Sequence, residues 1–116
     1  MEDIELPSSA DEAFDFAMEF IHSWEVAKIR KAAELDEIVP SPHAEDRAIE
    51  RDMDIDDFFH VIEHGKAVSK DLPYNIEGRA EGINFEGKTP GGKRIRLKIG
   101  WWNGYYEIAT VHSLRQ

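Results

Sequence analysis

The sequence predicts an α+β protein in which N-terminal helices pack on one face of a three- or four-stranded antiparallel sheet. Apolar residues recur at helical spacing in the first half of the chain, whereas apolar and polar residues alternate in the second half. Helices that precede the strands along a chain are typical of α+β folds. The length of 116 residues allows one domain with a single core.

The strongest local signal is Asn103-Gly104, which separates two strand-like segments within residues 93–114. Asn-Gly is typical of two-residue turns that need positive φ angles, so it predicts a β-hairpin. Such a turn fixes the register of both strands. The predicted pairs are Trp102 with Tyr105, Trp101 with Tyr106, Ile99 with Ile108, Leu97 with Thr110, and Ile95 with His112.

The two-residue period of a strand divides this hairpin into two faces. The face expected to enter the core carries Ile95, Leu97, Ile99, Trp101, Tyr106, Ile108 and Thr110. The other face is expected to be a basic and aromatic surface open to solvent. It carries Arg94, Arg96, Lys98, Trp102 and Tyr105, with Arg79 on the neighbouring strand.

Three helices are expected before the strands. Ser9 and Glu12 form a capping-box pattern for a long helix that ends near Ala33, and its apolar stripe is predicted to enter the core. This stripe contains Phe14, Ala17, Met18, Ile21 and Trp24. A second helix over 42–52 would be capped by Ser41, and a third over 55–64 by Asp54, with Gly65 at its end. Residues 66–71 and 79–86 are expected to add strands.

Charge is distributed unevenly along the chain, whose net charge is −10. Residues 1–63 contain 19 acidic and five basic residues, whereas residues 64–116 contain five acidic and nine basic residues. This asymmetry predicts a polar molecule with one basic face, although acidic helices that simply keep a small protein in solution give the same pattern. The acidic N-terminus and the lack of a long apolar run predict a cytoplasmic protein without a membrane segment.

The basic hairpin face is the first candidate site. Arg79, Arg94, Arg96 and Lys98 could bind phosphates, while Trp102 and Tyr105 could stack on bases. A charged solvent face that keeps the sheet soluble is the alternative interpretation.

Histidines give the second candidate site. His43, Arg47 and Arg51 are spaced at i, i+4 and i+8, so a histidine beside an arginine could act as acid or base on an anionic substrate. The predicted register puts His112 on the helix-facing side, where it could approach His43 if the second helix docks there. Solvated or packed histidines are the alternative.

Metal and cofactor chemistry is not expected. The chain has no cysteine, and the pair His60 and His64 has no third ligand at motif spacing. Phosphate loops, dinucleotide fingerprints and serine nucleophile elbows are missing from the sequence.

The sequence contains three further short motifs: the His43-Ala44-x-x-Arg47 helix, the strand segment Glu77-Gly78-Arg79 and the last-strand sequence Thr110-Val111-His112. Together they resemble a family of small prokaryotic domains of unknown function in the RelE/ParE-like toxin superfamily. The resemblance covers residues 41–114 and treats residues 1–40 as an N-terminal helical extension of a single domain. It implies a RelE-like fold, and relatives in that superfamily are metal-independent messenger-RNA interferases or gyrase inhibitors that an antitoxin neutralises.

The sequence and this resemblance together predict a toxin-like protein that binds or cleaves RNA and has an antitoxin-like partner. Arg94, Arg96 and Lys98 would hold phosphates, and His43, Arg47 and His112 would carry the catalysis. The alternative is a non-catalytic protein-interaction module whose basic strand face accepts an acidic partner segment.

Overall fold

The α+β class is confirmed by the structure, a computed structural model that describes residues 20–72, 81–102 and 104–114. Three helices and five strands follow one another along this part of the chain. They are α2 (Ser23–Glu34), β1 (Ile38–Pro40), α3 (Pro42–Glu50), α4 (Ile55–His64), β2 (Lys66–Asp71), β3 (Gly82–Lys88), β4 (Arg94–Trp102) and β5 (Tyr105–Ser113). None of the helices in these ranges is long and apolar enough to cross a membrane.

The sheet has five strands in the order β1-β5-β4-β3-β2, and it is mixed rather than antiparallel. β1 pairs with β5 in parallel, whereas the other neighbours are antiparallel. The expected three- or four-stranded antiparallel sheet is therefore wrong in this detail. Residues 38–40 form too short a strand, with a proline at its end, for a pattern of alternation to reveal it.

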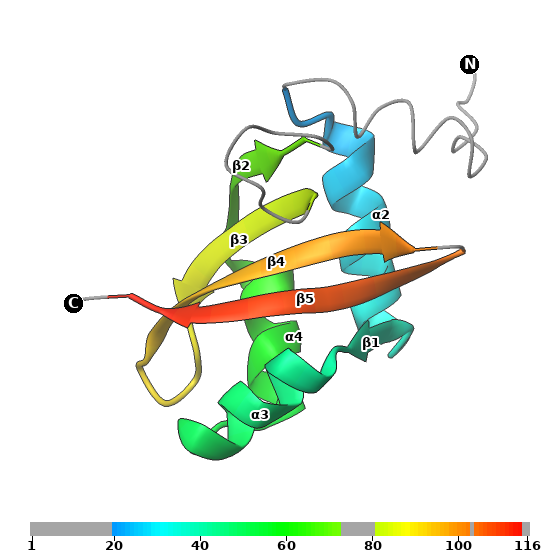
Figure 1. Cartoon of the computed structure of the whole chain (residues 1–116). Coiled ribbons are helices and arrows are strands. Elements are labelled where there is room, and N and C mark those ends of the chain that lie inside the picture. The colour runs from blue at the N-terminus through cyan, green and yellow to red at the C-terminus, as the bar shows by residue number, and fades with distance from the viewer. Residues whose placement is uncertain (1–19, 73–80, 103, 115–116) are drawn as a thin grey trace.

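Within the described residues, helices cover one face of the sheet (Figure 1). α2 and α4 lie behind the sheet in this view, while the opposite face points toward the viewer and has none of the described helices over it. α3 packs against β5 and β1, at the edge of the sheet where β1 is the outermost strand. We call the surface without helices the open face.

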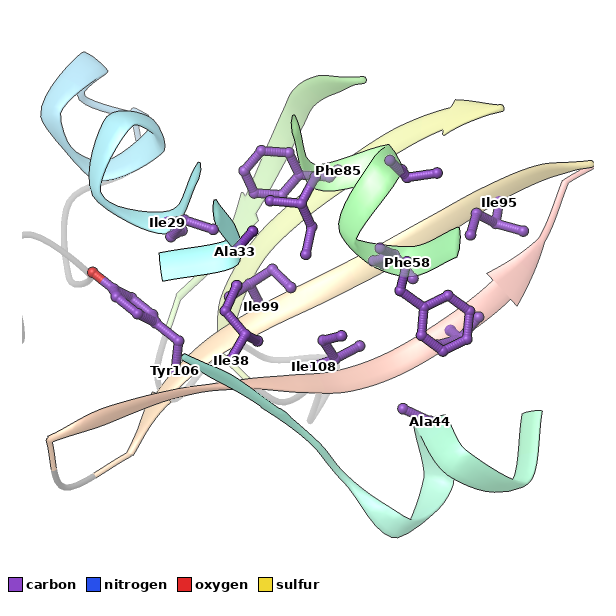
Figure 2. Packing of buried hydrophobic residues seen from close by; sticks show 14 of the residues in the cluster. Ile29, Ala33, Ile38, Ala44, Phe58, Phe85, Ile95, Ile99, Tyr106 and Ile108 are labelled. Atoms are coloured by element: carbon purple, nitrogen blue, oxygen red, sulfur yellow. The ribbon is translucent and has the colours of Figure 1, made fainter. Parts of the chain in front are cut away.

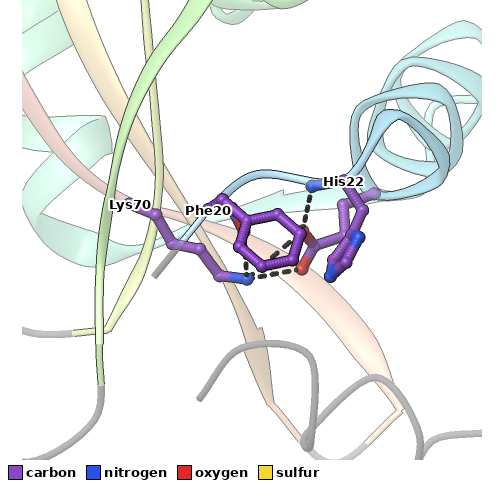
Figure 3. Close-up of polar contacts among 4 residues, drawn as sticks. Phe20, His22 and Lys70 are labelled. Carbon is purple, nitrogen blue, oxygen red and sulfur yellow. Dashed lines mark hydrogen bonds and ion pairs between the residues drawn. The ribbon is translucent and has the colours of Figure 1, made fainter. Parts of the chain in front are cut away.

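α2 begins at Ser23, so the expected continuous helix from Ser9 is wrong at residues 20–22. His22 has extended backbone angles and forms a capping box with Glu25, whose carboxylate accepts a hydrogen bond from the His22 amide at 2.8 Å. The same carboxylate pairs with Lys70 of β2 at 3.0 Å, and both side chains are buried (Figure 3). This ion pair fixes the start of α2 against the edge strand of the sheet.

The ends of α3 and α4 follow the predicted caps. The Ser41 hydroxyl accepts a hydrogen bond from the Ala44 amide at 3.1 Å, and Asp54 forms a capping box with Asp57. Gly65 follows the last residue of α4 as its C-cap, and an added Cβ atom there would lie only 2.4 Å from the Glu86 carbonyl oxygen, so the close approach of β3 requires glycine. Arg30 of α2 donates to the carbonyls of Ile62 and Gly65, which satisfies the end of α4.

One hydrophobic core lies between the sheet and the two covering helices (Figure 2). α2 contributes Ile29, Ala32 and Ala33, rather than the predicted stripe through Trp24, which is only half-buried. Ile21 packs against the edge of the core, and Phe14, Ala17 and Met18 lie outside the described residues. The largest fully buried side chains are Phe58, Phe85, Ile29, Ile62, Ile83, Ile95, Leu97, Ile99, Ile108, Val61 and Val111.

The hairpin register is correct near the turn and wrong farther away. Trp102 pairs with Tyr105, Trp101 with Tyr106 and Ile99 with Ile108, and Gly104 has the positive φ of 98° that this turn needs. Lys98 then pairs with Thr110, so Ala109 is an extra residue that forms a β-bulge in β5. As a result Leu97 pairs with Val111 rather than Thr110, and Ile95 pairs with Ser113 rather than His112.

Because of the bulge, each residue of β5 after Ala109 lies on the opposite face of the sheet from the one that the sequence predicts. Val111 enters the core, where it is 2% exposed, in the place that the sequence assigned to Thr110. Thr110 and His112 lie on the open face, so the predicted helix-facing position of His112 is wrong. Ser41 holds the bulge from the side, because its hydroxyl donates to the Ala109 carbonyl at 3.0 Å and its amide donates to the Ile108 carbonyl at 3.0 Å.

Candidate functional site

Polar side chains from four strands form two rows across the open face. Residues that are directly opposite on paired strands lie side by side on one face, so the register defines each row. The first row is His112, Arg96, Glu86 and Lys66, and the second is Thr110, Lys98, Asn84 and Ser69. Between them lies a hollow of about 440 Å³, lined by members of both rows and by Asp71.

In the second row, Lys98 and Asn84 are buried and form a polar network with Asp71 and Ser69. Lys98 Nζ lies 2.9 Å from Asp71 Oδ2, and both side chains are largely buried. The Asn84 amide donates to Ser69 Oγ at 2.9 Å and to Asp71 Oδ2 at 3.0 Å. The predicted exposure of Lys98 is therefore wrong, since this residue is only 6% exposed and its charge is balanced by a carboxylate within the sheet.

The first row is more accessible. Arg96 Nε donates to Glu86 Oε2 at 2.7 Å across the β3–β4 pair, and the Arg96 side chain is 43% exposed. Exposed ion pairs contribute little to stability and their partners exchange easily. Arg96 can therefore leave Glu86 for the anionic group of a ligand, whereas Lys98 is held by Asp71.

Two histidines from distant parts of the sequence meet beside this row. The ring centres of His43, at the start of α3, and His112, on β5, are 6.4 Å apart. Their approach depends on Ser41, which caps α3 and at the same time bonds to the bulge that turns His112 onto the open face. The sequence analysis selected both residues, but its predicted register put His112 on the helix-covered face of the sheet rather than on the open face.

The electrostatic surroundings of the histidine pair are positive. Burial lowers the pKa of His112 below its ordinary value of 6.5, and the charges of His43, Arg47, Arg96 and Lys98 lower it further. The positive charge of these neighbours would attract an anion to the His112 ring. Without a bound anion, the same charge favours the neutral form of His112. His43 Nε2 is buried and has no hydrogen-bond partner among the residues that the structure describes.

Arg47 lies one turn after His43 on α3 and pairs with Glu50 at 2.9 Å in a partly exposed contact. The structure thus brings together the three residues predicted to be catalytic, His43, Arg47 and His112, and places Arg96 and Lys98 beside them. An imidazole pair among cations can bind a phosphate and can exchange protons with it.

The remaining predicted residues are spread along the hairpin. Arg94 is two residues from Arg96 on the same face of β4, opposite Lys88. Tyr105 is 42% exposed but lies at the turn end of β5, about 23 Å from His112 at the usual rise of a strand. Arg79 and the side chain of Trp102 lie outside the described residues.

The sequence analysis did not identify Asp71 and Glu86, whose carboxylates pair with Lys98 and Arg96, or Asn84, whose amide binds Asp71. Within the strand predicted over residues 79–86, Ile83 and Phe85 share one face, so strand alternation puts Asn84 and Glu86 on the other face. No local pattern could show that Asp71 reaches Lys98, because β2 contains a bulge that shifts its register between Ala67 and Ser69.

Comparisons of the chain with protein-family models, with curated proteins and with solved structures found no match. The proposals for its function therefore depend on the geometry of the open face and on the motifs in its sequence.

Proposed function

We propose that this protein is a toxin-like RNA-binding and RNA-cleaving domain of RelE-like architecture, and that a backbone phosphate of single-stranded RNA lies between His43 and His112. The observation that carries the proposal is the separation of 6.4 Å between the centres of the two imidazole rings, with the charges of Arg47 and Arg96 acting at His112. Two proton-transferring groups around one phosphate are what RNA cleavage without a metal ion requires.

The reaction needs no group beyond the RNA and the two histidines. One imidazole accepts the proton of the ribose 2′-hydroxyl, and the 2′-oxygen then attacks the adjacent phosphorus. The bond from phosphorus to the 5′-oxygen of the next nucleotide breaks, and the other imidazole donates a proton to that oxygen. His112, whose pKa is lowered, suits the role of base because it is neutral at neutral pH, and His43 would be the acid.

In this proposal Arg47 and Arg96 would stabilise the phosphorane-like transition state. Negative charge builds on the non-bridging oxygens during the attack, and preorganised cations lower its energy. Arg96 would exchange Glu86 for the phosphate, whereas Lys98 would act through its charge while it remains bound to Asp71. Arg94 extends the same face and would hold a neighbouring phosphate.

Cleavage is tested with labelled single-stranded RNA in the presence of EDTA. We expect His43→Ala and His112→Ala each to reduce the rate by at least about 100-fold, the usual contribution of an acid or base. RNA with a 2′-deoxyribose at the scissile position should not be cleaved, because it lacks the nucleophile. His60→Ala is the matched control, since His60 forms another imidazole pair, with His64 on α4, at 4.6 Å.

Binding is tested separately by titration at several salt concentrations. Each phosphate contact with single-stranded RNA should contribute a slope of about 0.7 in log–log form. The double variant Arg47→Glu and Arg96→Glu should lose binding, and Lys31→Glu on α2 should not. Wild-type protein that neither binds RNA at low salt nor cleaves it would rule out the proposed function.

A non-catalytic protein-interaction module is the second candidate. In its favour, Lys98 and Arg96 already hold carboxylates, which are the groups that an acidic partner segment would bring to this face. RNA binding that is absent while an acidic peptide binds in competition with Glu86 would favour this alternative.

A further inference from the structure

A second hollow lies on the other side of the sheet, between α2 and the turn end of the β4–β5 hairpin. Its volume is about 510 Å³, which is within the range of ligand sites. Ala27 and Ala32 leave space on the helix, and Trp101, Tyr105 and Tyr106 supply aromatic surface from the strands. This apolar groove is separate from the open face and has no part in the proposed cleavage of RNA.

The aromatic wall of the groove is ordered by its own contacts. Trp101 and Tyr106 meet edge to face with ring centres 4.7 Å apart, and Lys28 Nζ lies over the Trp101 ring at 5.5 Å from its centre. Tyr106 is 6% exposed, so its ring is fixed by the core beneath it. A rigid aromatic wall can receive an apolar side chain without losing conformational freedom.

Apolar surface continues beyond the hollow. Leu35 is 52% exposed one helical turn beyond Lys31, and Tyr105 on the wall of the hollow is 42% exposed. Exposed apolar side chains beside an apolar hollow mark an interaction site.

Charge distinguishes the groove from the rest of this acidic protein. Among the residues that the structure describes, the charged side chains lining it are Lys28, Lys31 and Glu37, so this part of the lining is positive in a chain of net charge −10. Burial lowers the pKa of Lys28. Lys31 pairs with Glu34 at 3.5 Å in an exposed contact that a partner could replace.

We infer that this groove docks an acidic segment of a partner protein, which inserts an aromatic or large aliphatic side chain between α2 and the hairpin and places carboxylates against Lys28 and Lys31. The apolar side chain would provide most of the affinity, since buried anchors dominate such interfaces. The flanking carboxylates would provide orientation and would speed association with the lysines.

The inference is tested by fluorescence anisotropy with a labelled peptide that alternates phenylalanine and glutamate. Ala27→Trp should weaken binding by at least about tenfold, because the new ring fills the groove from an exposed helix position that the fold does not need. Ser23→Trp is the matched control, since Ser23 is also exposed on α2 but does not line the groove. The double change Lys28→Glu and Lys31→Glu should weaken binding to a similar extent.

Two further peptides examine the chemistry of the partner. A peptide with lysine in place of glutamate should bind at least about tenfold more weakly, and so should one with alanine in place of phenylalanine. The inference is overturned if Ala27→Trp binds the first peptide as well as wild type does, or if all three peptides bind equally. The variant Arg47→Glu with Arg96→Glu should keep peptide binding, which separates this groove from the open face even if the RNA proposal fails.

Discussion

The two faces of the sheet are made by the same strands but are stabilised in different ways. The covered face is apolar and its side chains are fully buried, from Ile83 and Phe85 on β3 to Leu97 and Ile99 on β4. The open face is polar, and its charges are arranged in opposite pairs such as Lys98 with Asp71. The difference shows that a sheet face with no described helix over it can still bury part of its charge in internal pairs, so its charges are not all available to a ligand.

Removal of a large side chain from the core that the covered face forms with α2 and α4 should have the greatest effect. We expect Phe58→Ala to lower the free energy of unfolding by about 3–5 kcal/mol, because it removes buried apolar area and leaves a cavity. Urea denaturation followed by circular dichroism measures this change. Val68→Ala, at a position 43% exposed, is the control, and an equal loss in both variants would contradict the assigned core.

Breaking the buried pair of the open face should have the next largest effect. Lys98→Met leaves the Asp71 carboxylate without its cation, and we expect a loss of roughly 3 kcal/mol, near the lower end for buried pairs. The double variant with Asp71→Leu should recover much of this loss, because both charges are then removed. If Lys98→Met alone has no effect on urea denaturation, the pair is solvated and the two faces differ less than the structure indicates.

The accessible pair of the same face should matter much less. Arg96→Met should change the free energy of unfolding by less than about 1 kcal/mol, because Arg96 and Glu86 remain partly solvated. The same variant should weaken RNA binding if the open face is the RNA site. A loss of stability as large as that of Lys98→Met would show that the first row is structural.

Titration of His112 should give the smallest effect on stability. Its pKa is lowered from 6.5 in the folded protein, so the unfolded chain binds a proton more readily. The stability that His112 contributes is therefore present above pH 6.5 and is lost as the pH falls through the lowered value. His112→Asn should reduce this part of the pH dependence.

An NMR titration of the His112 ring provides a direct measurement of its pKa. Inorganic phosphate should raise that pKa if the anion binds between the imidazoles, because negative charge favours the protonated ring. His60 serves as the control ring, and a pKa of His112 at or above 6.5 without phosphate would contradict the positive surroundings described for it.

Local signals predicted much of the fold. The caps at Ser41 and Asp54 and the turn at Asn103-Gly104 were identified from the sequence because each depends on a few adjacent residues. The parallel strand β1 was not identified, since its three residues gain their structure only from β5. The extent of α2 was overestimated because apolar spacing alone does not show that Glu25 caps the helix at His22.

The candidate site was predicted in part and for partly incorrect reasons. His43, Arg47 and His112 were selected and do lie together, but only because the bulge at Ala109 moves His112 to the open face. A single extra residue in a strand reverses every later side chain, and the sequence of β5 carries no sign of it. The neutralising roles of Asp71 and Glu86 were missed because they depend on pairing between strands rather than on neighbours in sequence.

The parallel pairing of β1 with β5 also has a consequence for the order of assembly. Ser41 and Ala109 are 68 residues apart in the sequence, whereas the β4–β5 hairpin closes through a two-residue turn. Contacts between distant residues form late because the chain between them must first become ordered. We therefore expect the hairpin to form early and the β1–α3 junction to dock last, so that His43 reaches His112 only when folding is complete.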